Sequence, residues 1–203
     1  MSDPIQIYGD RISGNCLKVL YTAQHLGREF VWRDIDVLKG ESRTDEFLRL
    51  SPAGQVPIVV TKDGHVLAQS NAIIGWLAEG STLIPADLFE RAKMYEWLFW
   101  EQYSHEPLIA VRRFQKLYLK KNDSQIAAEL LPKGNAALGL MDRHLSARAY
   151  FVGGALTLAD IALLAYTRLA HEGGFDLNEF QNVGAWVARC ENDLNVTPAK
   201  EAA

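Results

Sequence analysis

The first 80 residues alternate short apolar runs with segments of helical periodicity. Residues 5–8 form an apolar run that Gly9 and Asp10 close, and from about Cys16 the apolar positions recur at helical spacing until Gly27. This pattern predicts a strand, a turn and a helix. The same reasoning predicts a strand over 30–35, a short helix over 44–50, strands over 58–61 and 65–68, and a helix that Ser70 caps.

The order of these elements excludes a sheet in which all strands are parallel. The last two predicted strands are joined by the turn around Asp63 and Gly64, whereas a parallel pair needs a crossover of a dozen or more residues. These two strands must therefore run antiparallel. We expect an α/β domain with a mixed four-stranded sheet over residues 1–80.

The spacing of apolar and polar residues changes after Gly80. Residues 81–87, which include Pro85, are typical of a linker, and helical periodicity begins at Leu88 and continues to the end of the chain. We expect an all-helical domain over residues 87–203.

One segment of the helical part carries a strong helix-start signal. Thr157 is placed as the N-cap and Asp160 as the third helical residue, which is a variant of the capping box. Leu156 and Ile161 flank this pair at the positions of a hydrophobic staple. The segment therefore predicts a helix, and its role is in folding.

Composition and charge narrow the possible functions. The 203 residues are 48% hydrophobic and 23% charged, which excludes a disordered chain, and the net charge of −4 gives no basic surface for nucleic acid. No apolar run approaches the roughly 18 residues that span a bilayer, so no membrane partner is expected. Cys16 and Cys190 form no disulfide framework, which indicates a reducing compartment and the cytoplasm. The histidines lack the spacing of metal ligands, and no metal is predicted.

The turn at Ser13 is the first candidate for chemistry. Ser13, Gly14, Asn15 and Cys16 lie where the first strand leads into the first helix, so the positive end of the helix dipole would stabilise an anion or a thiolate there. Ser13 as a simple helix cap is the alternative. Ser13 and Cys16 also have the spacing of a redox pair with its first cysteine replaced, although a buried packing role suits Cys16 better.

Two later motifs have the chemistry of peptide and carboxylate binding. Val56 precedes Pro57 at the start of a strand, which suits a cis peptide bond and leaves the Val56 backbone to pair with a peptide. Gln69 and Ser70 open a helix, where a carboxylate is stabilised.

In this order and spacing, the three motifs resemble the thioredoxin-like, glutathione-binding domain of the cytosolic glutathione transferases. The helical part of the chain supports the same resemblance. Residues 156–161 are similar to that family's capping box, and residues 97–107 are similar to a stretch in its bacterial members. The resemblance covers nearly the whole chain and points to a serine-type enzyme.

The resemblance implies a role for each motif. Ser13 would donate a hydrogen bond to the thiolate of glutathione, the Val56 backbone would pair with the cysteinyl residue beside a cis Pro57, and Gln69 and Ser70 would hold the γ-glutamyl end. Gln69 stands where many members have Glu, which removes a charge that would face the glutathione amine. The further candidates for contact with glutathione are Asn15, Gln55, Lys39 and Arg43. The candidates for contact with a hydrophobic second substrate are Ile12, Tyr103 and His105.

The chemistry expected of Ser13 also follows from the ionisation of thiols. An ordinary thiol has a pKa of about 8.5, so few of its molecules are nucleophilic at neutral pH. A hydroxyl hydrogen bond and a helix N-terminus, each worth about 1 kcal/mol or somewhat more, would lower that pKa by roughly one to two units.

The expected function is conjugation of the glutathione thiolate to a small electrophile, with glutathione as cosubstrate and a role in detoxification. The resemblance also implies a homodimer, with the helix at Ser70 and those beginning near Leu88 as its interface elements. The aromatic residues Trp97, Phe99, Trp100 and Tyr103 then fit core packing or a dimer contact better than a cofactor site. The alternatives are glutathione-dependent reduction of peroxides or disulfides, in which Cys16 would matter, and a non-catalytic binding or assembly module.

Overall fold

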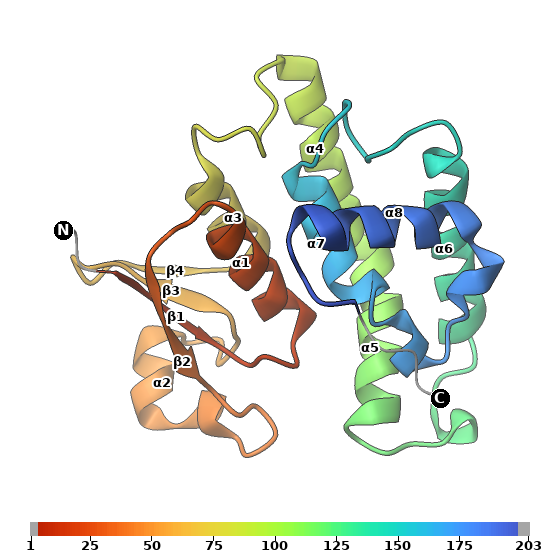
Figure 1. The fold of residues 1–203 in the computed structure, drawn as a ribbon. Helices are drawn as coiled ribbons and strands as arrows, with labels where there is room; N and C mark the ends of the chain where they lie inside the picture. Colours follow the sequence, from red (N-terminus) through yellow and green to blue (C-terminus); the bar gives the residue numbers. More distant parts are fainter. Residues whose placement is uncertain (1–3, 199–203) are drawn as a thin grey trace. The chain divides into compact units, whose positions relative to one another are not determined.

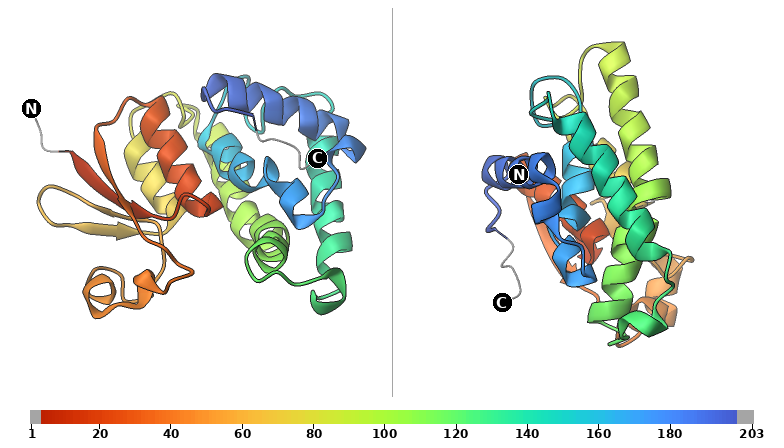
Figure 2. Two further views of the ribbon diagram at one scale, coloured as in Figure 1. Left: turned by 60° about the horizontal axis from the view of Figure 1, so that its bottom comes forward. Right: turned by 90° about the vertical axis from the view of Figure 1, so that its right-hand side faces the viewer.

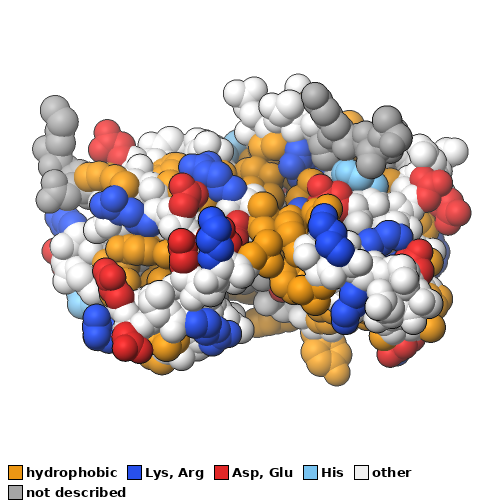
Figure 3. Space-filling view, turned by 90° about the horizontal axis from the view of Figure 1, so that it is seen from below, with side chains coloured by type: hydrophobic (Ala, Val, Ile, Leu, Met, Phe, Trp, Pro, Cys, Tyr) orange, Lys and Arg blue, Asp and Glu red, His pale blue; other side chains and the backbone are white. Residues whose placement is uncertain are grey.

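The computed structural model describes residues 4–198, which form two compact units that meet in sequence between Ser81 and Thr82. The first unit contains a sheet with helices, and the second is helical (Figure 1). No helix among residues 4–198 is long and apolar enough to cross a membrane. On the face shown in Figure 3, acidic and basic side chains are interspersed over the described surface.

The first unit has the predicted mixed sheet. Its strands are β1 (Ile5–Gly9), β2 (Phe30–Asp34), β3 (Ile58–Val60) and β4 (Val66–Ala68), in the spatial order β2-β1-β3-β4. β1 pairs with β2 in parallel, whereas the β1/β3 and β3/β4 pairs are antiparallel. The short turn between β3 and β4 imposes the antiparallel pairing, as expected from its length.

Within residues 4–81, three α-helices and one 3-10 turn complete this unit. They are α1 (Gly14–His25), the 3-10 turn η1 (Glu41–Arg43), α2 (Asp45–Leu50) and α3 (Ser70–Ala78). α1 and α3 pack side by side on one face of the sheet, and α2 lies on the other side (Figures 1 and 2). Ile7, Ile58, Ile73 and Ile74 are fully buried in the core, and each contributes roughly 1.5–3 kcal/mol by leaving water.

Two predicted helix starts are displaced. α1 begins at Gly14 because Ser13 occupies the N-cap position, two residues before the predicted start at Cys16. The prediction that Ser70 caps the last helix of this unit is wrong by one residue. Gln69 is the N-cap and Ser70 is the first helical residue.

The second unit is built from α4 (Leu88–Trp100), α5 (Glu106–Leu117), α6 (Leu130–Leu145), α7 (Leu158–Thr167) and α8 (Gln181–Asp193), with the 3-10 turns η3 (Asp123–Gln125), η4 (Ala170–Gly173) and η5 (Leu177–Glu179). α4 continues into α5 through one π-helical stretch, η2 (Glu101–His105). Pro107 lies in the first turn of α5 and has no N–H to donate to the preceding turn, which explains why the helix widens here.

The predicted capping box forms at the start of α7, whose residues are all buried. Asp160 Oδ2 accepts hydrogen bonds from the N–H and the hydroxyl of Thr157, both at 2.9 Å. Its other oxygen accepts from Phe151 N–H at 2.9 Å and from Trp186 Nε1 at 3.0 Å. Burial raises the pKa of Asp160 above its ordinary value, while these four donors oppose the shift.

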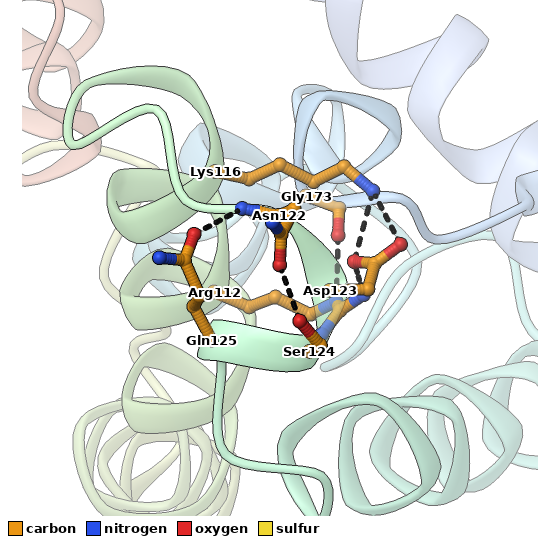
Figure 4. Close-up of polar contacts among 7 residues, drawn as sticks. All are labelled: Arg112, Lys116, Asn122, Asp123, Ser124, Gln125 and Gly173. Carbon is orange, nitrogen blue, oxygen red and sulfur yellow. Dashed lines mark hydrogen bonds and ion pairs between the residues drawn. The ribbon is translucent and has the colours of Figure 1, made fainter.

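A polar cluster at the end of α5 was not predicted (Figure 4). Arg112 donates to Gly173 O at 2.8 Å and to Asp123 Oδ1 at 2.5 Å. Lys116 also donates to Asp123, and this hydrogen bond is the main reason why the pKa of Asp123 is lowered. The cluster ties η3 and η4 to α5.

Candidate functional site

The sheet register brings the three sequence motifs to one edge of the first unit. Tyr8 near the end of β1 pairs with Ile58 at the start of β3, and Ile58 pairs with Ala68 at the end of β4. The residues that follow β1, precede β3 and follow β4 therefore leave the sheet at the same edge. These are the segments that contain Ser13, Val56 and Ser70.

Ser13 holds the N-cap position of α1, but its side chain makes no capping hydrogen bond to the helix backbone. Its backbone is extended (φ −82°, ψ 122°), its carbonyl accepts from Leu17 N–H at 2.9 Å, and its hydroxyl makes no capping hydrogen bond. The half-buried hydroxyl thus lies at the positive end of the α1 dipole. This placement differs from the alternative in which the Ser13 side chain serves as a helix cap.

Asp10 organises the turn that holds Ser13. The apolar pattern predicts only that Asp10 closes the first strand. One of its carboxylate oxygens accepts from Ile12 N–H at 3.1 Å and the other from Val37 N–H at 3.2 Å. Its carbonyl accepts from Ser13 N–H at 3.0 Å. The signal available in the sequence was the tendency of Asp to accept a hydrogen bond from the backbone two residues later.

Cys16 is fully buried in the first turn of α1. Its Sγ accepts from Asp10 N–H at 3.3 Å. Burial raises the pKa of Cys16 to about 12, although this hydrogen bond and one with the Ser13 side chain lower it in part. The side chain is therefore a neutral thiol at physiological pH, in the setting expected of a packing residue.

The Val56–Pro57 peptide bond is cis. Pro57 is buried and Val56 is half-buried. Among residues 4–198, neither the N–H nor the carbonyl of Val56 has a hydrogen-bond partner. A ligand backbone is thus able to pair with Val56 at the edge of the sheet.

The start of α3 joins the start of α1 through a side-chain hydrogen bond. Ser70, whose side chain is almost buried, donates from its hydroxyl to Asn15 Oδ1 at 3.0 Å. Gln69 precedes it in a left-handed backbone conformation (φ 69°), with an exposed side chain that does not cap the helix. The structure therefore brings Ser13, Asn15 and Ser70 to the N-termini of two adjacent helices.

The three remaining candidates for glutathione contact lie on exposed segments between β2 and β3. Lys39 pairs with Asp36 at 2.9 Å, and the hydrogen bond to that carboxylate raises the pKa of Lys39. Arg43 donates to Ala53 O at 3.0 Å and lies close to Gly54, and these two residues directly precede Gln55. Gly54 has a φ of 59°, and a Cβ there would come 2.9 Å from the backbone oxygen of Ser42, so the position favours glycine.

The candidates for contact with a second substrate have different surroundings. Ile12 is half-buried beside Ser13. Tyr103 is 88% exposed on η2, whereas His105 is fully buried and its Nε2 is 3.0 Å from Thr167 Oγ1. The interior position of His105 keeps its side chain from touching a substrate in this conformation. The aromatic residues of this segment have different surroundings, since Trp97 packs against Phe151 in the core while Phe99 is exposed.

An open, mainly apolar pocket of about 430 Å³ on the surface of the second unit was not predicted. It lies between α5 and the end of α7 and is lined by Ala110, Val111, Phe114, Gln115, Leu119, Lys121 and Tyr166. Within the described residues, no group of three or more His, Cys, Asp or Glu side chains is placed to hold a metal ion.

Comparison with known proteins identifies the family. The profile of the glutathione S-transferase N-terminal domain matches residues 12–79, and that of the C-terminal domain matches residues 94–193. The chain therefore belongs to the glutathione S-transferase family of enzymes. The predicted family and fold are confirmed.

Individual relatives agree with this assignment. A crystal structure of glutathione S-transferase from Pseudomonas fluorescens is 40% identical with a TM-score of 0.90, covering 93% of this chain and 95% of that one. Glutathione S-transferase theta-3 of Mus musculus is 30% identical over 98% of this chain and 86% of the mouse protein. Elongation factor 1-gamma of Artemia salina is 32% identical over 72% of this chain, but the match spans about a third (34%) of that protein.

Proposed function

We propose that this enzyme conjugates glutathione to apolar electrophiles and that Ser13 stabilises the reacting thiolate. The observation that carries the proposal is the Ser13 hydroxyl at the N-terminus of α1, where it makes no capping bond. A thiolate at this position would accept a hydrogen bond from the hydroxyl and would feel the helix dipole. The two effects would lower the thiol pKa by roughly one to two units and make much of the bound glutathione nucleophilic at neutral pH.

The rest of glutathione is proposed to follow the edge of the sheet. The cysteinyl backbone would pair with the N–H and carbonyl of Val56, which have no partner among the described residues. The γ-glutamyl end would lie at the start of α3, beside Gln69 and Ser70. Gln55, Arg43 and Lys39 are proposed to face the glycine carboxylate, since two of them carry positive charge.

The electrophile is proposed to be an apolar molecule. Ile12 adjoins Ser13 in the sequence, is half-buried, and would contact the electrophile. Exclusion of water strengthens the interactions that stabilise charge during the reaction. We propose a role in detoxification on this basis.

Glutathione binding tests this function. Calorimetry of the wild-type chain with glutathione is expected to give saturable binding at micromolar to low millimolar concentration, and turnover is expected with at least one class among halogenated aromatics, epoxides and unsaturated carbonyls. Absence of binding at millimolar glutathione would instead support a non-catalytic module. A reductase in which Cys16 attacks is disfavoured by the burial and raised pKa of that thiol.

A homodimer is proposed on the exposed apolar side chains of α4. Leu88, Phe89 and Phe99 are 79%, 75% and 72% exposed in the single chain, and association of two chains through α4 would remove apolar surface of this kind from water. Sedimentation at micromolar concentration is expected to show about twice the chain mass of 22.7 kDa, and Phe99→Asp is expected to shift the distribution toward monomer. A wild-type monomer at that concentration would contradict the proposal.

A further inference from the structure

The carboxylate of Asp10 divides its two oxygens between two segments of the first unit. Oδ1 accepts from Ile12 N–H at 3.1 Å, in the turn that leads to Ser13, and Oδ2 accepts from Val37 N–H at 3.2 Å, in the loop over residues 35–40. The second bond joins residues that are 27 positions apart in the sequence. Asp10 is half-buried, and partial exclusion of water strengthens both bonds.

The loop over residues 35–40 holds its own shape through Asp36. The Asp36 carboxylate accepts from two backbone N–H groups of the loop, both at 3.0 Å, and pairs with the Lys39 ammonium at 2.9 Å. These bonds all lie within the loop. The bond from Val37 N–H to Asp10 therefore ties the shaped loop, with the charge of Lys39, to the end of β1.

The backbone of Asp10 acts on the turn from the other side. Its carbonyl accepts from Ser13 N–H at 3.0 Å, and its N–H donates to Cys16 Sγ at 3.3 Å. Together with the bond from Ile12 N–H to the carboxylate, these contacts hold the N-cap of α1 through one residue. Loss of the carboxylate would release the turn and move the Ser13 hydroxyl from its place at the helix N-terminus.

We propose that Asp10 is a positioning residue that holds the Ser13 hydroxyl and the Lys39 ammonium in one arrangement for glutathione. Asp10 acts on the thiolate through the turn, and on the glycine carboxylate through the loop, without itself touching the ligand. This inference rests on the proposed function and adds to it the residue that links the two ends of the site.

Two substitutions separate the two bonds of the carboxylate. Asp10→Asn keeps one acceptor oxygen, and asparagine, like aspartate, bonds to the backbone N–H two residues later. Its NH₂ group then faces Val37 N–H, so the bond to the loop is lost while the turn is kept. Asp10→Ala loses both bonds. The two variants lack the same negative charge, so a comparison between them cancels the direct effect of that charge on a thiolate.

The first readout is the pH midpoint of the ultraviolet thiolate absorbance, measured with glutathione bound at saturation. Asp10→Ala is expected to have a midpoint about half a pH unit above that of Asp10→Asn, because only the alanine variant releases the turn at Ser13. Equal midpoints in the two variants would overturn the proposal.

The second readout is calorimetry with glutathione and with its glycine ethyl ester, in which the glycine carboxylate is blocked. Asp10→Asn is expected to weaken binding of glutathione about threefold and binding of the ester less than about 1.5-fold, because the ester has no carboxylate for Lys39 to face. Equal weakening of the two ligands, or no weakening of either, would overturn the proposal. This comparison decides the matter even if Asp10→Ala does not fold.

A control variant and the wild type complete the test. Asp63→Asn removes an exposed carboxylate from the turn between β3 and β4 and is expected to change neither readout. Unfolding midpoints establish which variants are folded. If the wild type binds no glutathione, the proposed function fails and the role of Asp10 with it. If the wild type binds glutathione and the Asp10 variants give the contradicting results above, only the role of Asp10 is overturned.

Discussion

Ser13→Ala is expected to lower kcat/KM for conjugation by about five- to tenfold at pH 6.5. The substitution removes the hydroxyl donor while the N-terminus of α1 remains, so the pKa of the bound thiol should rise by about one unit or somewhat more. Below both pKa values, each unit reduces the thiolate fraction tenfold. Steady-state rates with glutathione and one electrophile measure the effect.

The pH dependence of this defect distinguishes ionisation from general damage to the site. As pH rises past the pKa of the thiol in the variant, both proteins hold thiolate and the difference in rate should shrink. Ser13→Thr retains a hydroxyl and is expected to recover much of the activity. A defect of constant size from pH 6 to 9 would mean that Ser13 contributes to binding or packing and not to thiol ionisation.

Asp160→Asn is expected to reduce the free energy of unfolding by about 3 kcal/mol. The carboxylate accepts four hydrogen bonds in the core, from Phe151, Trp186 and two donors of Thr157. An amide of the same shape has only one acceptor oxygen. Its NH₂ group must therefore face N–H or O–H donors that are buried, and not all of these donors can reorient to find another acceptor. Urea unfolding followed by circular dichroism measures the loss.

A surface aspartate provides the matched control for this prediction. Asp63 is exposed in the turn between β3 and β4, and Asp63→Asn is expected to change stability by less than about 0.5 kcal/mol. Equal effects at the two positions would show that the hydrogen bonds to Asp160 do not contribute the expected stability.

The parts of the fold that depend on local sequence were predictable. The turn at Asp63 and Gly64 is too short for a crossover, which forces the antiparallel pairing of β3 and β4. The capping box of Thr157 and Asp160 lies within four residues, and it forms as predicted. Periodicity also distinguished the sheet unit from the helical unit.

Contacts between residues distant in sequence were not predictable in the same way. Arg112 meets Gly173 across 61 positions, and Ser70 meets Asn15 across 55. No local periodicity encodes such contacts, because they depend on how whole elements pack. The same limit explains why the burial of His105 was not predicted, since helical spacing alone could not distinguish a buried position from one that faces a substrate.

The sequence predicted which segments contribute to the candidate site, but it did not predict how their side chains are arranged. The motifs at Ser13, Val56 and Ser70 were singled out from the sequence, and the strand register shows why they leave the sheet at one edge. The donor and acceptor directions at Asn15 and Ser70, and the role of Asp10 in the turn, required the structure. The functional role of each of these residues stays a prediction until it is measured.

The ultraviolet absorbance of the thiolate of bound glutathione, titrated with pH in the wild type and in Ser13→Ala, tests the role of Ser13 most directly. We expect the wild-type midpoint to lie roughly one to two units below that of an ordinary thiol and the Ser13→Ala midpoint to lie about one unit above the wild type. Equal midpoints in the two proteins, or a wild-type midpoint equal to that of free glutathione, would contradict the account.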